Sequence, residues 1–337
     1  MSNLASNLTI AIDAMGCDLG PSVVVDGAIQ ASQVYPGVKL ILVGQEDVIQ
    51  AELSRHSNTG QISILHASEI ITPDEVPTSA IRQKKDSSLV VGLKAVKEGQ
   101  ASGFVSAGST GALLTGATVI IGRKKGIERP ALGAPIPTRK GFTLLADSGA
   151  NMDCKASYLV HFGQIGAEYM EKALGVKNPR VGLINVGTEE EKGNAAVKEA
   201  YALLAESGLN FVGNVEAREI PEGAVDVAVC DGFVGNILLK FMEGLAQAMM
   251  GMIKEELMST TISKLGALMA KGAFGKIKKR FDYREVGGAP FLGLKSLVVK
   301  AHGSSDAFAM KNAILKCIDF EKAATPHLTM DTIKKGE

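Results

Sequence analysis

Short apolar runs typical of β-strands recur along this chain, and a small polar or glycine-rich cluster follows each of them directly. The clusters begin at Asp13, Ser106, Asp147, Asn185, Cys230 and Ala301. Most of them precede a helical pattern, and alternation of strand and helix predicts a mostly parallel sheet covered by helices on both faces. The carboxyl ends of such strands lie along one edge of the sheet, where ligands bind. The sequence therefore predicts an α/β fold whose strand ends surround a ligand, and glycine turns before helices favour an anionic one.

Apolar spacing also predicts the individual elements. Strands are expected over 8–14, 39–44, 62–67 and 296–301, and helices over 21–33, 88–98, 110–122, 154–174, 194–206 and 306–317. Residues 233–285 break the alternation with two apolar stretches at helical spacing, so we expect a helical excursion there. The 337 residues fit one compact α/β catalytic unit with a core of about 8–325, built as a single body or as two intertwined lobes.

Composition narrows the class of protein. With 46% hydrophobic residues and zero formal net charge, the chain can bury a large core and carries no overall field that favours nucleic acid. Its four cysteines form no CxxC, which argues against a zinc site or a disulfide framework and favours a reducing, cytoplasmic setting. The amino-terminal residues do not resemble a signal peptide, and no apolar stretch reaches the roughly 18 residues of a spanning helix.

The turn from Ser106 to Gly111 is the strongest candidate for phosphate binding. Its members are Ser106, Gly108, Ser109, Thr110 and Gly111, which offer hydroxyls and closely spaced backbone N–H groups before a helix. The turn matches neither a dinucleotide-binding fingerprint nor a Walker P-loop. An ordinary tight strand–helix turn would explain the same residues.

Three further clusters place carboxylates and amides around glycine at strand ends. They contain Asp13, Gly16 and Asp18; Asp147, Gly149 and Asn151; and Asp231, Gly232 and Asn236. Such groups can orient a cation or bind a carbonyl or phosphate oxygen. For the clusters at Asp147 and Asp231, each taken alone, helix capping is the better explanation, and only the recurrence of such clusters favours a shared site.

Basic residues and histidine complete the set of candidates. Arg82, Lys84 and Lys85 form a cluster that is either an anion clamp or a solvated helix start. His302 follows a strand and precedes a glycine, so it could donate to an oxyanion or move a proton. The histidines lack metal-ligand spacing, and we expect no catalytic metal.

The segment 258–281 is basic and amphipathic. It is compatible with a membrane surface, with an acidic protein partner, or with a subunit interface that leaves its basic face in solvent.

Taken together, seven sequence blocks resemble the PlsX family, the bacterial acyl-acyl-carrier-protein:phosphate acyltransferases. The blocks are IDAMGCD, RQKKDSS, SAGSTGA, DSGAN, CDGFVGN, GGAPFLG and AHGSS, in the family's order over about residues 8–325. The resemblance implies a three-layer α/β/α fold similar to the isocitrate and isopropylmalate dehydrogenases and phosphotransacetylase. It also implies a cytoplasmic homodimer that associates peripherally with the membrane and needs no cofactor.

The reaction implied is transfer of a fatty acyl group from acyl carrier protein to inorganic phosphate. We expect phosphate near the Ser106–Gly111 turn with support from Lys84, Lys85 or Arg82. Asn185, Asn236 and His302 are expected at the carbonyl or oxyanion, and Asp13, Asp18, Asp147 and Asp231 are expected to orient the donors. A metal- and NAD-dependent decarboxylating dehydrogenase and a non-catalytic scaffold for acyl carrier protein are the alternatives.

Overall fold

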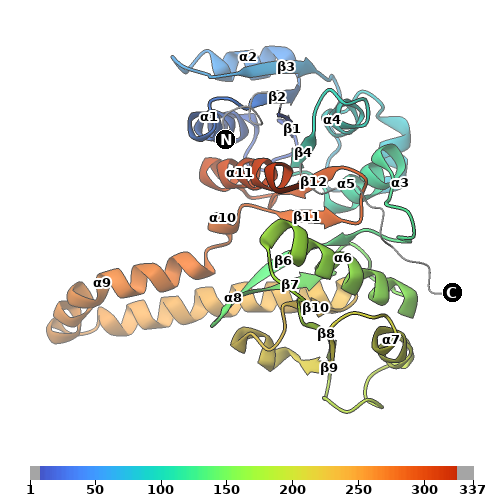
Figure 1. The fold of residues 1–337 in the computed structure, drawn as a ribbon. Helices are drawn as coiled ribbons and strands as arrows, with labels where there is room; N and C mark the ends of the chain where they lie inside the picture. Colours follow the sequence, from blue (N-terminus) through green and yellow to red (C-terminus); the bar gives the residue numbers. More distant parts are fainter. Residues whose placement is uncertain (1–7, 325–337) are drawn as a thin grey trace.

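The computed structural model describes residues 8–324, and it arranges them around two β-sheets that meet edge to edge, one above the other in the view of Figure 1. The strands of the first sheet, in spatial order, are β3 (Ile62–His66), β2 (Lys39–Gly44), β1 (Thr9–Asp13), β4 (Gly103–Ser106), β12 (Leu297–Lys300), β11 (Ala289–Leu292) and β5 (Ala131–Leu132). The strands of the second, in the same way, are β6 (Ala134–Thr138), β7 (Gly141–Ala146), β10 (Val227–Val229), β8 (Val181–Asn185) and β9 (Phe211–Glu216). The predicted α/β class is confirmed, with the strands divided between two sheets.

The neighbouring strands β3, β2, β1, β4 and β12 pair in parallel, as do β7, β10, β8 and β9. Antiparallel pairing is confined to β11 with its two neighbours and to β6 with β7. Strand β6 carries Pro135 and Pro137 and lies at an edge, where a residue without an N–H costs no ladder hydrogen bond. Both sheets therefore bring several parallel carboxyl ends to one side.

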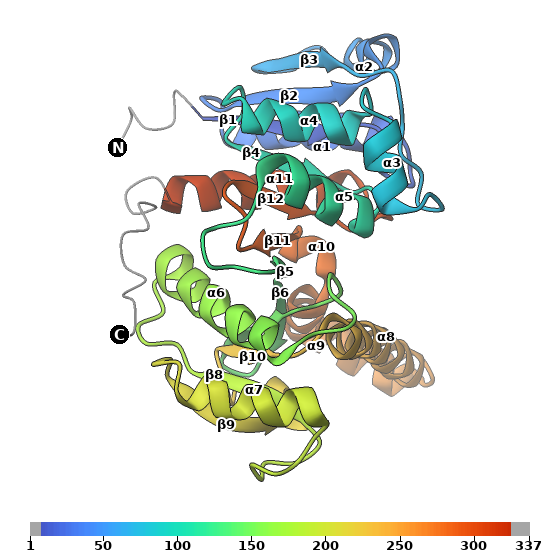
Figure 2. The same cartoon turned by 90° about the vertical axis from the view of Figure 1, so that its right-hand side faces the viewer.

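Helices cover both faces of each sheet (Figure 2). The α-helices of the described residues are α1 (Pro21–Val34), α2 (Glu46–Leu53), α3 (Pro77–Gln83), α4 (Ser88–Lys97), α5 (Thr110–Gly116), α6 (Ala156–Leu174), α7 (Ala195–Ala205), α8 (Gly232–Leu257), α9 (Thr261–Phe281), α10 (Tyr283–Val286) and α11 (Ala307–Ala324), and not all of them lie on a sheet. Strand β1 shows how the layers form, because Ile10 and Ile12 pack with α1 and α11 while Ala11 packs on the opposite face with α4 and α5. In the second sheet, α6 and α7 cover one face and the start of α8 covers the other. The three-layer arrangement matches the expectation.

The predicted helical excursion is present. Helices α8 and α9 run side by side as an antiparallel hairpin that projects from the body of the molecule (Figure 1). Asp231 caps the start of α8 and Thr260 caps the start of α9, each through its side chain. The first turns of α8 lie at the carboxyl ends of the second sheet, so the hairpin is anchored beside the strand ends.

Candidate active site

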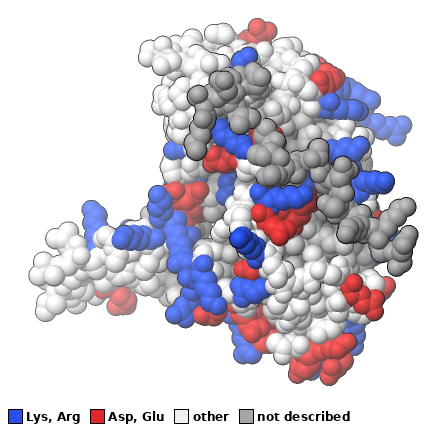
Figure 3. Space-filling model, viewed as in Figure 1, with Lys and Arg blue, Asp and Glu red and all other residues white. Residues whose placement is uncertain are grey.

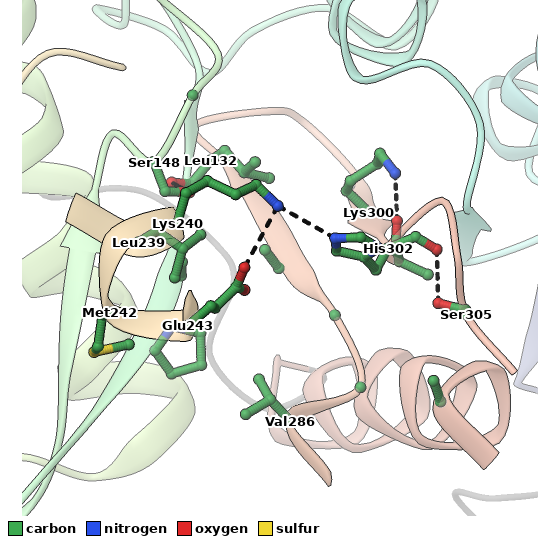
Figure 4. A pocket seen from close by; sticks show the side chains of 18 of the residues that line it. Leu132, Ser148, Leu239, Lys240, Met242, Glu243, Val286, Lys300, His302 and Ser305 are labelled. Carbon is green, nitrogen blue, oxygen red and sulfur yellow. Dashed lines mark hydrogen bonds and ion pairs between the residues drawn. The ribbon is translucent and has the colours of Figure 1, made fainter. Parts of the chain in front are cut away.

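A cavity of about 270 Å³ lies where the carboxyl ends of the two sheets face each other. Its polar wall contains Thr110, Ser148, Gly149, Asn236, Lys240, Lys300 and His302. Figure 4 shows Lys240 and Glu243 reaching in from α8, opposite Lys300 and His302, which come from the end of β12 and the loop after it. The prediction that the strand ends surround one site is therefore matched by a cavity.

Two of the predicted loops from the first sheet are tied together by a buried hydrogen bond. The Ser106 hydroxyl donates to Asp13 Oδ2 at 2.7 Å and accepts from the Gly108 N–H at 3.0 Å, while Asp13 Oδ1 accepts from the Met15 and Gly16 N–H groups. A Cβ at Gly16 would lie 2.8 Å from the Gly108 nitrogen, so only glycine permits this approach. Asp13, Ser106 and Gly16 therefore hold the loops in place.

The helix start after this turn is placed at the cavity. Ser109 caps α5 by accepting from the Ala112 N–H at 3.4 Å, and Thr110 lines the cavity wall. Gly111 packs closely against Pro77 of α3. On the neighbouring loop, exposed Asp18 lies against Gly303, and its N–H donates to the Gly303 carbonyl at 3.0 Å. Thr110 is thus the member of the predicted phosphate turn that faces the cavity.

Lys300 is the principal cavity residue that the sequence reasoning missed. Its ammonium donates to the Ala107 carbonyl at 3.1 Å and to the Ala301 carbonyl. Desolvation lowers the pKa of Lys300 to about 8, although nearby Asp18, Asp13 and Cys17 favour its charged form. A lysine at the end of the apolar strand SLVVK, directly before AHGSS, was the available signal.

His302 is held from both ring nitrogens. Its Nε2 lies 3.3 Å from Lys240 Nζ and its Nδ1 lies 2.9 Å from Ser304 Oγ. Because an ammonium only donates, Nε2 accepts in this contact, and the Ser304 N–H also donates to Nδ1 at 3.3 Å. Burial, followed by the charge of Lys240, lowers the pKa of His302, so the imidazole is neutral at pH 7. Lys240 also pairs with Glu243 at 3.4 Å, and the sequence reasoning identified neither residue.

In the second sheet, backbone N–H groups donate hydrogen bonds to the predicted carboxylates. Buried Asp147 accepts from the N–H groups of Leu132 at 2.9 Å and Asn151 at 2.6 Å, and also from the Asn151 side-chain amide at 2.9 Å. Asp231 accepts from the Val234 N–H at 2.7 Å as a helix cap. A Cβ at Gly232 would lie 2.7 Å from the Asn151 carbonyl oxygen, so the two loops need glycine to pack. The capping interpretation therefore holds for Asp231, whereas Asp147 and Asn151 hold loop backbone in place and Gly149 and Asn236 line the cavity.

Of the predicted residues only Thr110, Gly149, Asn236 and His302 line the cavity, and four that have not yet been described also lie outside it. Asn185 bonds to the Lys192 carbonyl at 3.0 Å and to the Val186 N–H within its own loop. Lys84 pairs with Glu75 and donates to the Ile70 carbonyl, each at 2.7 Å, so its charge is used to hold the chain before α3. Lys85 is exposed, and Arg82 lies in a shallow surface hollow with Thr78, Ser79 and Gln83. The expected anion clamp therefore lies apart from the cavity.

Apolar side chains form much of the remaining cavity wall, beside Glu243, Arg280, Asp282 and Ser305. The apolar residues are Leu132, Pro135, Leu239, Met242, Ala246, Phe281 and Val286. Polar groups thus gather at the strand ends, and an apolar surface leads away from them along α8. The cavity can hold a small anion beside a long apolar group.

Comparison with known proteins agrees with this arrangement. The family model described as "Fatty acid synthesis protein" matches residues 8–326. A phosphate acyltransferase of Clostridium botulinum (strain ATCC 19397 / Type A) is 52% identical over 308 residues, 91% of this chain and 92% of the relative. A phosphate acyltransferase of Alkaliphilus oremlandii is 50% identical over 314 residues, 93% of both chains.

Solved structures share the fold at low sequence identity. A phosphotransacetylase from Streptococcus pyogenes covers 94% of each chain with a TM-score of 0.62 and 19% identity. A putative 4-hydroxythreonine-4-phosphate dehydrogenase from Salmonella typhimurium covers 93% of this chain and 99% of its own, with a TM-score of 0.54 and 12% identity. The family match and the close relatives confirm the resemblance read from the seven sequence blocks, and the chain belongs to the fatty acid synthesis protein family of phosphate acyltransferases.

Proposed function

We propose that this protein transfers a fatty acyl group from acyl carrier protein to inorganic phosphate, giving an acyl phosphate for phospholipid synthesis. The observation that carries the proposal is the meeting of the desolvated Lys300 ammonium and the neutral His302 imidazole at one end of an apolar-walled cavity. The phosphate acyltransferase relatives support the reaction class. Acyl carrier protein as donor follows from the resemblance of the sequence blocks to the PlsX family.

Phosphate is placed between Thr110, Gly303 and the Lys300 ammonium. A cation that is poorly solvated attracts an anion more strongly than one in water, because the effective dielectric constant is lower. The acyl chain and the arm of its carrier lie along the apolar wall formed by Leu239 and Met242. This arrangement brings the thioester carbonyl carbon to the phosphate.

The reaction then needs one addition and one elimination. A phosphate oxygen attacks the thioester carbonyl carbon and forms the new C–O bond, and the carbonyl oxygen becomes an oxyanion beside Lys300 and Asn236. The C–S bond then breaks and its electron pair leaves with the thiolate. Where the attacking phosphate carries a proton, the neutral imidazole of His302, released from Lys240, accepts it and returns it to the sulfur. Stabilising the oxyanion with one preorganised donor is worth about 3–4 kcal/mol.

Direct attack by phosphate requires no acyl-enzyme. Burial raises the pKa of Cys17 and of Cys230, and that of Cys154 to about 12, so none of these thiols is a ready thiolate at neutral pH. The two sheets jointly supply the cavity wall, and we propose that they act as one catalytic unit.

The test is an assay of the purified protein with long-chain acyl-acyl carrier protein and inorganic phosphate, in the presence of a chelator, with acyl phosphate trapped as its hydroxamate. We expect phosphate-dependent product in the native protein and its loss in His302→Ala. His56→Ala, at a histidine that follows α2 and pairs with Asp26, serves as the matched control and should retain full activity. Bound acyl carrier protein without any turnover would favour the scaffold instead.

We also propose that the α8–α9 hairpin joins two copies of the chain and touches the membrane surface. No described helix is long and apolar enough to cross a membrane. The hairpin nevertheless exposes apolar side chains along both helices, including Phe241 (65% exposed), Met252 (56%), Ile262 (86%) and Met269 (85%). Figure 3 shows the hairpin as a largely uncharged projection with lysine and arginine side chains near its base and along one edge.

The two helices are proposed to serve different contacts. On α8, Phe241, Leu245 and Met249 recur at every fourth position, which forms a single stripe suited to a partner helix. On α9, Lys264 and Lys271 accompany exposed Leu268 and Met269, a combination typical of anionic membrane surfaces. Phe241→Glu/Leu245→Glu should yield a monomer by light scattering, whereas Leu268→Glu/Met269→Glu should lose only vesicle binding. If both double variants kept dimer formation and vesicle binding, the proposed division of roles between α8 and α9 would be contradicted.

A further inference from the structure

A second cavity, of about 430 Å³, lies at the opposite end of the β11–β12 hairpin from the candidate active site. Ala289 and Lys300 pair at the active-site end of this hairpin, whereas Leu292 and Leu297 at its turn end line the second cavity. Helix α6 and the end of α11 form the other walls, and both views place these helices beside β11 (Figure 2). No described residue lines both cavities.

The floor of this cavity is apolar. Leu292 from the hairpin lies in one apolar cluster with Ile165 of α6, and Phe291, Leu294 and Phe320 of α11 also line the cavity. Tyr169 packs edge-on against Phe320 with ring centroids 5.2 Å apart, so the two aromatic rings close one side. A volume of this size falls within the range of small-molecule sites, and the lining fits an alkyl chain.

The rim is positively charged. Four lysines line the cavity, namely Lys124, Lys125, Lys172 and Lys295, together with Glu168 and Glu321. Glu168 is shared between Lys124 at 3.3 Å and Lys172 at 3.1 Å. Burial raises the pKa of Glu321 to about 7, which reduces its negative charge near neutral pH. The lysines therefore outnumber the opposing charges.

We infer that the second cavity binds an amphipathic anion, a single carboxylate or phosphate head on an alkyl chain. The apolar floor takes the chain and the exposed ammonium groups of Lys125 and Lys295 take the head. Among the described residues neither of these two lysines has a carboxylate partner, so their charge is available. A free fatty acid and an alkyl phosphate share this chemistry, and the site itself does not depend on the reaction proposed above.

Calorimetric titration of the full chain tests the inference. The probes are dodecanoate and dodecyl phosphate below their micelle concentrations, with dodecyl maltoside as the uncharged head and inorganic phosphate as the head alone. We expect saturable binding of at least one charged amphiphile, and at least tenfold weaker binding of the maltoside and of inorganic phosphate. Whichever of dodecanoate and dodecyl phosphate binds more tightly shows whether the site takes a carboxylate or a phosphate head. Equal binding of the maltoside would overturn the inference.

Variants assign the binding to this cavity. Ala173 lines it, so Ala173→Trp should fill the space and weaken binding at least tenfold. Lys125→Glu/Lys295→Glu should do the same, whereas Lys39→Glu/Lys97→Glu, with the same charge change at exposed positions elsewhere, should not. Met242→Trp blocks the first cavity and should leave this binding event in place. Undiminished binding in both Ala173→Trp and Lys125→Glu/Lys295→Glu would overturn the inference, even where the acyltransferase reaction is intact.

Discussion

The loop over 300–305 and the loop over 147–151 have the same sequence signature, a polar cluster with glycine at a strand end, but their polar groups serve different ends. In the second loop, Asp147 is buried and accepts hydrogen bonds from Leu132, Ala150 and Asn151. In the first, Lys300 and His302 line a cavity, and desolvation lowers the pKa of both. The comparison teaches that a strand-end position becomes chemically useful only where the backbone leaves a polar group open to a ligand.

The largest expected effect is on the rate at Lys300. Lys300→Met keeps the apolar stem and removes the charge, so we expect kcat to fall about 10³-fold, the magnitude found when one preorganised oxyanion donor is removed. The folded state should survive, because the substitution also removes a poorly solvated ammonium. Steady-state kinetics and thermal unfolding of the same preparation check both statements. A normal kcat in Lys300→Met would show that the polar groups of the 300–305 loop have only a structural role, like those of the 147–151 loop.

Asp147 should show the opposite behaviour. Asp147→Ala leaves buried N–H groups of Leu132, Ala150 and Asn151 without their acceptor, and we expect a loss of about 3–5 kcal/mol in the free energy of unfolding. Asp147→Asn, which keeps one acceptor oxygen, should lose less. Denaturant titration measures the change, and kcat per folded molecule should remain near normal. A stable but inactive Asp147→Ala protein would erase the contrast between the loops.

The pH dependence should follow Lys300. Because its charged form supports the reaction, kcat/KM should fall as the pH rises through about 8, and Lys300→Arg should move that fall to higher pH. The free energy of unfolding should change with pH in the opposite direction. The folded pKa lies below the unfolded value of about 10.4, so the unfolded state binds more protons between these two values, and the free energy of unfolding rises with pH across that window.

Below pH 8 the cost of burying the charged lysine is fully present. Lys300→Met should therefore lack the rise in stability between about pH 8 and 10.4, which chemical unfolding at several pH values would detect. Asp13, Asp18, Cys17 and Lys240 contribute to the same field and remain unchanged in this variant. An identical pH profile in the native protein and the variant would assign the titration to another group.

Much of the fold could be predicted because its signals are local. The helix expected over 154–174 is observed as Ala156–Leu174, and the excursion expected over 233–285 contains α8 and α9. Short strands such as β5 and β11 were missed, because two to four residues carry no periodicity and their pairing is antiparallel and distant in sequence. The division into two sheets depends on this pairing.

The site was predicted less well for a related reason. His302, Asn236 and Thr110 were found because they stand in conspicuous glycine turns. Lys300 was missed because a lysine that ends a strand is usually exposed, and only the packing of β12 between β4 and β11 desolvates it. Lys84 was expected at the anion, but its charge is satisfied by Glu75, nine positions earlier in the sequence. The sequence identified the strand ends, but it did not identify which groups bond to the polar residues that stand there.

The smallest effect is expected at the basic cluster before α4, which extends the comparison to charges outside the cavity. Lys85 is exposed and its side chain lies apart from the lining residues, so Lys85→Ala should change kcat/KM less than Lys300→Met by two orders of magnitude or more. Lys84→Met should act through stability, because it leaves Glu75 and the Ile70 carbonyl without their cation, and the effect should be small because solvent screens a part-exposed pair of this kind. A large rate loss in Lys85→Ala with unchanged unfolding would instead bring the cluster into the active site, by closure of the 82–88 segment over bound phosphate.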